Sequence, residues 1–164
     1  MFQRIKTIFT PRAQKALALF MVFAFLLTSC RDKEAEALEV YRDHMSVFFD
    51  NVTNLSNSLN AIDKDAKDAT QTLLSLLDSL GREFETLRGF EIPEDFSSIS
   101  DITIDAADSM KKAVELYHRA YDGDYDAAAE ADAYSYYERA SRCIRVIMQV
   151  LNGEAPSVEG VTYQ

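Results

Sequence analysis

The stretch LEVYRDHMSVFFDNVTNLSNSLNAI, residues 38–62, decides the fold. Its apolar residues recur at alternating intervals of three and four, a spacing that places them along one side of an α-helix. Neither Gly nor Pro interrupts the stretch, so we expect a single helix from about residue 33 to 61. The apolar stripe of this helix, which other helices must cover, consists of Leu38, Tyr41, Met45, Phe48, Val52, Leu55, Leu59 and Ile62.

A second helix is expected after the polar segment DKDAKDAT, residues 63–70. The carboxylates of Asp63, Asp65 and Asp68 are suited to cap its N-terminus. Gly89 directly follows its last turn, as is common at a helix C-terminus. The stripe of this helix consists of Leu73, Leu77, Leu80, Phe84 and Leu87.

The first two stripes can also be joined through the alanines between them, which gives one helix of about 55 residues. We favour two separate helices, because a single helix of that length would be much longer than the two helices that follow.

Two more helices follow a short linker. Pro93 with Glu94 behind it is typical of a first helical turn, so a short lead-in is expected before the third helix. Gly123 separates the third helix from the fourth, and Asp124 is placed to cap the fourth. The third stripe consists of Ile99, Ile102, Ala106, Met110, Ala113, Leu116, Tyr117 and Ala120. The fourth consists of Ala129, Ala133, Tyr136, Ala140, Cys143, Ile147 and Val150.

The four expected helices are roughly 29, 24, 24 and 27 residues long, and their connections are short. Helices of matched length with short connections are typical of bundles in which neighbours run antiparallel. We therefore predict an all-α chain in which residues 34–152 form an antiparallel up-down-up-down four-helix bundle. Residues 153–164 are expected to form a flexible tail.

The N-terminal segment has the composition of a secretory signal. Residues 1–29 carry four basic side chains and no acidic one. Residues 16–27 then form an unbroken run of twelve apolar residues, which suits a signal peptide and falls short of the roughly 20 that a membrane-spanning helix needs. The run closes on Leu27-Thr28-Ser29-Cys30, which resembles a bacterial lipobox.

The lipobox resemblance implies a cellular location and a lipid anchor. It implies cleavage between Ser29 and Cys30, removal of residues 1–29, and diacylglyceryl and N-acyl groups of the palmitate type on Cys30. Residues 30–33 would then form a short tether to the cell membrane, on its extracytoplasmic side. In a two-membrane envelope, Arg31 after the cysteine resembles the pattern for the outer membrane. The alternative is an uncleaved N-terminal anchor with an incidental cysteine.

Charge and cysteine content narrow the classes of function. All 27 acidic residues but only 13 of the 17 basic ones follow Cys30, so the mature net charge is 13 minus 27, or −14. So acidic a chain is repelled by nucleic acid and by anionic headgroups, so we expect no nucleic-acid binding and attachment through acyl chains. Cys143 is the only other cysteine, and its place on an apolar stripe favours a buried hydrophobe over a nucleophile.

Two motifs are similar to parts of metal sites, and both lack ligands. Glu115 and His118 form one E-x-x-H pair, but di-iron bundles need a second, and Tyr41 stands where a pair with His44 needs its carboxylate. The aspartates of residues 122–126 repeat the start of a calcium loop that then lacks its Gly and its final Glu. We therefore expect no metal, no cofactor and no catalytic residue.

Tyrosines and arginines gather on the third and fourth helices. Most of the tyrosines are expected to seal the core beside the small alanines, and the arginines to pair with acids of neighbouring helices. The residues that lie off the main stripe are better placed for a partner. The candidate partner surface consists of Tyr134, Tyr137, Arg139 and Arg142.

From Leu116-Tyr117-His118 to Leu151-Asn152-Gly153-Glu154 the chain is similar to small helical bacterial lipoproteins of unknown function. That resemblance implies a helical fold and a location in the cell envelope, and it implies no activity. We therefore expect a non-enzymatic, lipid-anchored envelope protein that acts through contacts with another envelope protein. The alternative is a binding module for a small ligand or cation within or on the helical bundle.

Overall fold

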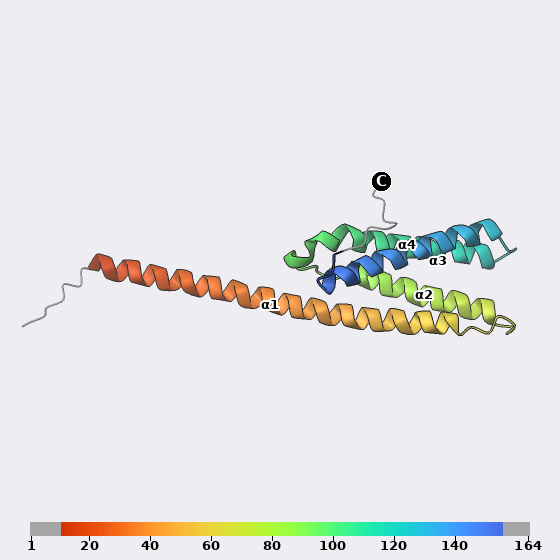
Figure 1. The fold of residues 1–164 in the computed structure, drawn as a ribbon, viewed down its shortest axis with the longest axis horizontal. Coiled ribbons are helices and arrows are strands. Elements are labelled where there is room, and N and C mark those ends of the chain that lie inside the picture. The colour runs from red at the N-terminus through yellow and green to blue at the C-terminus, as the bar shows by residue number, and fades with distance from the viewer. Residues whose placement is uncertain (1–10, 156–164) are drawn as a thin grey trace, which may run out of the picture. The chain divides into compact units, whose positions relative to one another are not determined.

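The computed structural model describes the backbone of residues 11–155 and the side chains of residues 33–155. Every regular element in this part of the chain is helical, which confirms the all-α prediction. No helix among the described residues combines the length and apolar character needed to cross a membrane. The elements, shown in Figure 1, are α1 (Pro11–Asn60), α2 (Ala69–Arg88), the short 3-10 helix η1 (Glu94–Ile99), α3 (Ser100–Tyr121) and α4 (Ala127–Leu151).

Helix α1 runs through the boundary between two compact units, Met1–Val40 and Tyr41–Gln164. It begins at Pro11 rather than near residue 33, since neither Gly nor another Pro interrupts the residues in between. The second unit holds the core, where the predicted stripe of α1 supplies Tyr41, Met45 and Phe48, each at most 2% exposed.

The predicted break between the first two helices is confirmed, because α1 ends at Asn60 and α2 begins at Ala69. The expected capping by acidic side chains is wrong. Asp68 occupies the N-cap position without a side-chain hydrogen bond to the helix. The Asp63 carboxylate instead accepts a hydrogen bond from the backbone N–H of Asp65 at 3.0 Å. These acids shape the connection, and α2 is shorter than expected.

Helix α2 packs against both α1 and α3. The ring of Phe84 meets that of Phe48 of α1 edge to face, with 5.5 Å between the ring centroids. One turn earlier, Gly81 lies against α3, where a Cβ on this residue would stand 3.3 Å from Val114 Cγ2. The absence of a side chain at residue 81 therefore lets the two helices approach closely.

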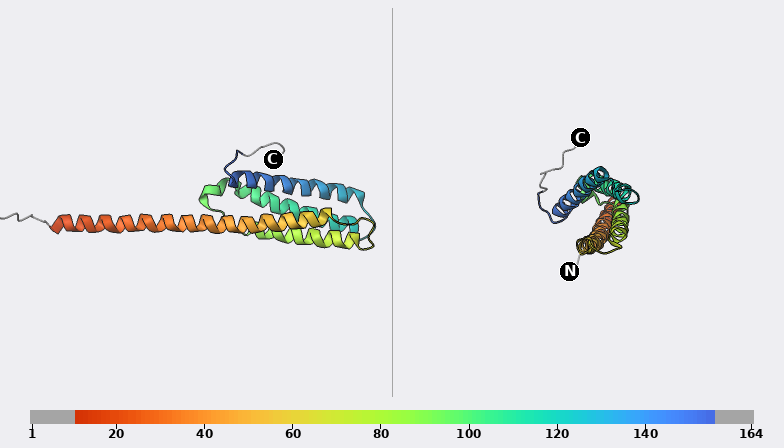
Figure 2. Two further views of the ribbon diagram at one scale, coloured as in Figure 1. Left: turned by 60° about the horizontal axis from the view of Figure 1, so that its bottom comes forward. Right: turned by 90° about the vertical axis from the view of Figure 1, so that its right-hand side faces the viewer.

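Helices α3 and α4 lie side by side (Figure 2) across an interface of small residues. The predicted stripe residues Cys143 and Ile147 are buried as expected, but Tyr136 is 38% exposed, so its assignment to the stripe is wrong. The alanines bring the backbones too close for a ring to fit between them, and the ring turns outward. The buried alanines, each at most 1% exposed, are Ala106, Ala107, Ala113, Ala120, Ala129, Ala133 and Ala140.

The lead-in expected at Pro93 is confirmed as η1. Its side chains Phe96 and Ile99 are buried, and the Phe96 ring lies 5.8 Å from the ring of Tyr41. The Tyr41 hydroxyl has no hydrogen-bond partner among the described residues, and burial raises the pKa of this phenol to about 12.

The N-cap of α4 is Asp126, so the prediction of Asp124 is wrong. Asp126 Oδ1 accepts hydrogen bonds from the backbone N–H groups of Ala128 and Ala129, both at 3.0 Å. Arg119 Nη2 pairs with the other carboxylate oxygen at 3.1 Å. Hydrogen bonding by the Ala129 N–H, then by Arg119, lowers the pKa of Asp126. The carboxylate therefore joins the end of α3 to the start of α4.

Replacing Asp126 by Ala should shift the urea midpoint of unfolding clearly downward, since two N–H groups of the first turn lose their acceptor. Asparagine is a good N-cap without a charge, so Asp126→Asn should restore most of the stability and lose only the Arg119 pair. Circular dichroism during urea unfolding measures both effects. Asp124→Ala is the matched control, and an equal fall for that variant would contradict the assignment of the cap.

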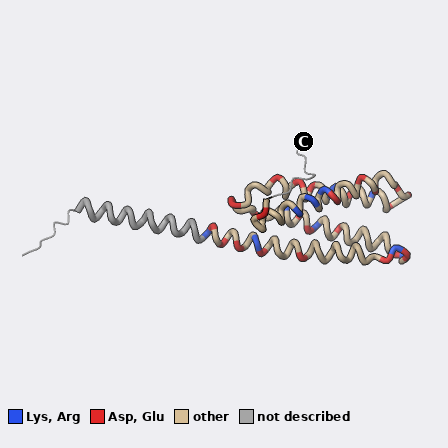
Figure 3. The backbone as a smooth tube through the Cα atoms, viewed as in Figure 1, with Lys and Arg blue, Asp and Glu red and all other residues tan. Residues whose placement is uncertain are grey.

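Charged residues of both signs are distributed along the helices and their connections (Figure 3). Ion pairs join neighbouring helices, among them Arg88 with Asp108 between α2 and α3, and Arg139 with Asp105 between α3 and α4.

Candidate functional site

The second unit contains a pocket to which all four helices contribute, with a volume of about 120 Å³. Helix α1 supplies Val52 and Ser56 to it, and α4 supplies Tyr137, Ser141 and Ile144. The remaining lining residues are Leu80, Phe84 and Met110 of α2 and α3. The pocket is thus mostly apolar, with three hydroxyl-bearing side chains.

Of these residues, Tyr137 alone belongs to the candidate partner surface, whereas Val52, Leu80, Phe84 and Met110 were expected in the apolar stripes. Ser56 and Ser141 are small polar residues that each lie four positions after a larger residue, Val52 or Tyr137, on the same helical face. This change from a large to a small side chain is the sequence signal that indicates the pocket. Both side chains are only partly exposed. Ser141 Oγ donates a hydrogen bond to the Tyr137 carbonyl at 2.9 Å, so the hydroxyl is satisfied within its own helix.

The four residues of the candidate partner surface do not share one environment. Tyr134 is 54% exposed and donates a hydrogen bond to Glu138 at 2.9 Å. Tyr137 is half-buried and lines the pocket. Arg142 Nη1 lies 3.7 Å from a Glu138 oxygen. Arg139 faces α3, where its guanidinium forms bidentate hydrogen bonds to the carboxylate of Asp105.

Around Asp105 the structure brings together groups that are far apart in the sequence. Arg139 Nε and Nη2 reach the two carboxylate oxygens of Asp105 at 2.9 and 3.0 Å. Cys143 Sγ lies 3.5 Å from Asp105 Oδ2, and Ser109 Oγ lies 3.3 Å from Oδ1. Burial, followed by the charge of Asp105, raises the pKa of Cys143 to about 12. The thiol is therefore protonated at neutral pH, and the cluster fastens α3 to α4 and supplies no nucleophile.

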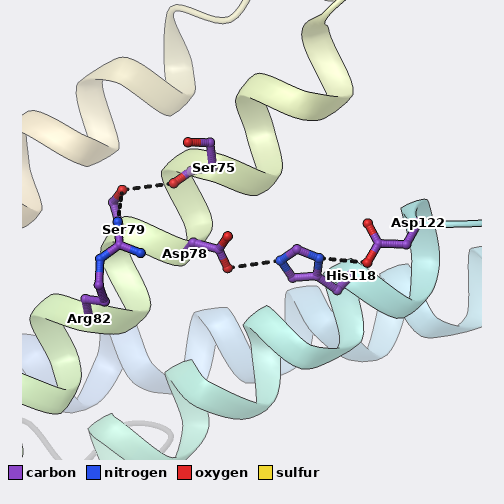
Figure 4. A network of polar contacts seen from close by, with 6 residues as sticks. All are labelled: Ser75, Asp78, Ser79, Arg82, His118 and Asp122. Carbon is purple, nitrogen blue, oxygen red and sulfur yellow. Dashed lines mark hydrogen bonds and ion pairs between the residues drawn. The ribbon is translucent and has the colours of Figure 1, made fainter.

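His118 of α3 lies between two carboxylates, Asp78 of α2 and Asp122 at the end of α3 (Figure 4). Its Nε2 lies 3.0 Å from Asp78 Oδ1, and its Nδ1 lies 2.9 Å from Asp122 Oδ2. The hydrogen bond to Asp78, followed by that to Asp122, raises the pKa of the imidazole. Glu115, the other half of the E-x-x-H pair, lies 3.4 Å from Lys112 instead.

The contribution of His118 to stability should fall as the pH rises. A group whose pKa is raised by folding stabilises the folded state fully below its unfolded value of 6.5, and loses that effect as the pH passes the folded value. We expect the difference in free energy of unfolding between wild type and His118→Gln to be largest near pH 5 and to shrink towards about pH 9. Urea unfolding at several pH values measures it. His44→Gln is the matched control, and a difference that grows with pH would contradict the expectation.

Two of the three aspartates of residues 122–126 already have partners within the protein. Asp122 is paired with His118, and Asp126 caps α4 and pairs with Arg119. Nearby, the hydroxyls of Tyr121 and Tyr125 both donate to the Glu130 carboxylate, which lowers the pKa of Glu130. The charge of this segment is used to hold the turn between α3 and α4.

A wider, more open depression of about 440 Å³ lies at the connection between α1 and α2. Asp63 and Asp68 are its charged lining residues, beside the side chains of Ile62 and Leu76. Among side chains 33–155, no group of three or more His, Cys, Asp or Glu residues is arranged to hold a metal ion.

The lipobox residues Leu27, Thr28, Ser29 and Cys30 lie outside the side chains that the structure describes, as does the tail from residue 156 onward. The pocket, the Asp105 cluster and the His118 pair are therefore the features on which function can be argued from geometry. No protein-family model, curated protein or solved structure matches this chain.

Proposed function

We propose that this chain is a lipid-anchored, non-enzymatic envelope lipoprotein that acts through contacts with another protein. The observation that carries the proposal is the segment ending in Leu27-Thr28-Ser29-Cys30. A basic start, an apolar run of twelve residues and a cysteine after two small residues are what lipid attachment requires. The anchor places the protein on the extracytoplasmic side of a membrane, in the outer membrane where the cell has one.

The polar clusters of the second unit support a non-catalytic role. His118 and Cys143 are the usual kinds of base and nucleophile, and each contacts a carboxylate of a neighbouring helix, Asp78 and Asp105 respectively. Cys143 is 1% exposed, so its thiol has no access to a substrate. The chemistry-bearing side chains are thus used in the scaffold.

We further propose that the part of α1 from Tyr41 onward packs with α2, α3 and α4 as an antiparallel up-down-up-down four-helix bundle. Three pairings support this arrangement: Phe48 with Phe84 between α1 and α2, Gly81 with Val114 between α2 and α3, and the alanine interface between α3 and α4. Each helix would then lie beside the one that follows it in the chain.

The alternative, a binding module for a small ligand or cation, has the pocket as its support. Its volume of about 120 Å³ is small beside the 300–1,000 Å³ of typical ligand pockets. Asp122 and Asp126, on either side of Gly123, are already paired with His118 and Arg119 and offer a cation few free oxygens. Protein contact is therefore the better-supported role.

Metabolic labelling with a radioactive fatty acid tests the anchor. Wild-type protein should carry the label and fractionate with membranes, and Cys30→Ala should lose the label completely, because no other residue of the segment has a thiol that could form the thioether. Cys143→Ala is the control and should keep the label. Label retained by Cys30→Ala, or none on wild type, would refute the proposal.

Crosslinking in intact cells, followed by pull-down, tests the protein contact. A partner recovered with wild type and lost with Cys30→Ala supports a role that depends on the anchor. Recovery of no stable partner with either form counts against that role.

A further inference from the structure

The size of the pocket between α1 and α4 limits what it can hold. A buried apolar cavity of about 150 Å³ is known to accept one benzene ring. The present pocket, at about 120 Å³, is somewhat smaller and open to solvent, so it suits one branched aliphatic side chain or part of one ring and is too small for a cofactor. Single side chains that fill such pockets are typical anchors of protein interfaces.

The walls of the pocket have the geometry of a socket for a helical side chain. Val52 and Ser56 stand four residues apart on α1, and Tyr137 and Ser141 stand four residues apart on α4. In packed helices a side chain of one helix enters a hole formed by four residues at this kind of spacing. Here the hole is shared between two helices, and the occupant would lie along both.

The same edge of α4 remains partly uncovered beyond the pocket. Tyr134, Tyr137, Ser141, Ile144 and Met148 follow one another at intervals of 3, 4, 3 and 4, as on one helical face. Tyr134 is 54% and Met148 is 42% exposed. The 14 steps between Tyr134 and Met148 span about 21 Å, which is about four helical turns.

The facing edge of α1 shows the same pattern. Phe49, Val52, Ser56 and Leu59 follow at intervals of 3, 4 and 3, and each is only partly buried. Two partly exposed stripes of matching period thus flank one pocket. An amphipathic helix with apolar residues at i, i+3 or i+4, and i+7 has the shape to cover both.

Charge beside the pocket favours an acidic occupant. Arg145 follows Ser141 by one helical turn, is exposed, and makes no ion pair among the described residues. Arg142 lies on the next face, where its Nη1 is 3.7 Å from a carboxylate oxygen of Glu138. On a chain that is otherwise strongly acidic, this is a local positive edge.

We infer that the pocket between α1 and α4 receives one aromatic or branched aliphatic side chain from an amphipathic helix of a partner protein, whose acidic flank lies beside Arg145. The inference rests on the proposed function, because it assigns the proposed protein contact to this pocket and states which kind of helix the partner would present. The walls contributed by Val52, Ser56, Tyr137 and Ser141 set the register of that helix.

The test is a selection of helical peptides on the full chain held in detergent. The probe is a display library of amphipathic peptides of about 15 residues, long enough to follow the α4 edge. Enriched peptides should share apolar residues at i, i+3 or i+4, and i+7, with Glu or Asp beside them. Replacing the central apolar residue of an enriched peptide by Ala should weaken binding about tenfold or more.

Matched serine variants locate the binding site. Ser141→Leu fills the socket and should weaken binding about tenfold or more. Ser135→Leu is the control: Ser135 lies on the same helix, is exposed, and makes the same kind of bond to the carbonyl four residues before it. Ser56→Leu repeats the test from α1, with Ser58→Leu as its control, so one misfolded variant does not decide the result.

Charge reversal adds an independent readout. Arg145→Glu should weaken the enriched peptides several-fold at low salt, with the loss shrinking at high salt, because the contact is exposed and screened. Lys in place of Glu on the peptide should have the same effect.

Three results overturn the inference: no enriched peptide, peptides with a basic flank, or equal binding to Ser141→Leu and Ser135→Leu. Self-association of the chain that Ser141→Leu abolishes would assign the pocket to a second copy and overturn it as well. Failure here leaves the fatty-acid label on Cys30 unchanged. Failure of the proposed anchor removes that label while the peptides still bind, so the two failures are distinguishable.

Discussion

Replacing Phe84 by Ala should lower the free energy of unfolding by about 3–5 kcal/mol. The ring is 2% exposed and packs edge to face on Phe48, with 5.5 Å between centroids. Truncation removes the transfer free energy of the ring and leaves a cavity beside the existing pocket, which Phe84 also lines. Domains of this size are stable by about 5–15 kcal/mol, so the variant should lose a large share of its stability.

Urea unfolding followed by circular dichroism measures this loss. Phe84→Leu should lose less than Phe84→Ala, because it retains most of the apolar volume. Glu85→Ala, at the exposed neighbouring position, is the control and should change stability by about 0.5 kcal/mol or less. Similar values for Phe84→Ala and Glu85→Ala would show that α2 does not pack as described.

Enlarging Ala140 to Leu should cost about 1–3 kcal/mol, through the opposite mechanism. Ala140 is 0% exposed and faces the alanines of α3, where the close approach of two helices leaves no space for three more carbons. The helices have to separate or the new side chain has to leave its preferred rotamer. Either adjustment also strains the nearby contact between Arg139 and Asp105.

Ala131→Leu is the matched control, since residue 131 is exposed on the same helix and Leu is nearly as good a helix former as Ala. Its free energy of unfolding should stay within about 0.5 kcal/mol of wild type. A crystal structure of Ala140→Leu would show where the strain goes. Wild-type stability in Ala140→Leu would mean that the interface between α3 and α4 is looser than the alanines indicate.

The helices and most of their buried faces were predictable because both depend on local spacing. Intervals of three and four correctly marked Met45, Leu80, Ala113 and Ile147 as core. Two similar residues in the same turn defeat this kind of reasoning. Asp124 and Asp126 are equally good caps by residue type, and only the observed start of α4 selects Asp126.

The candidate site was largely beyond prediction because it depends on contacts between distant residues. The sequence does not indicate that His118 meets Asp78, forty positions earlier, or that Cys143 meets Asp105. The pocket is lined by side chains of all four helices, so the apolar stripe of any one helix does not indicate it. Periodicity shows which side of a helix is apolar and does not show how completely its neighbours cover it.

The alanine interface between α3 and α4 has a consequence for the order of folding. Residues 122–126 alone connect the two helices, so their contacts close a short loop and cost little chain entropy. Small side chains also lose little rotamer freedom when the pair forms. Pairs of this kind form early, and α2 and the second half of α1 then have a preformed surface to join. The pair of helices α3 and α4 is thus the expected folding nucleus of the second unit.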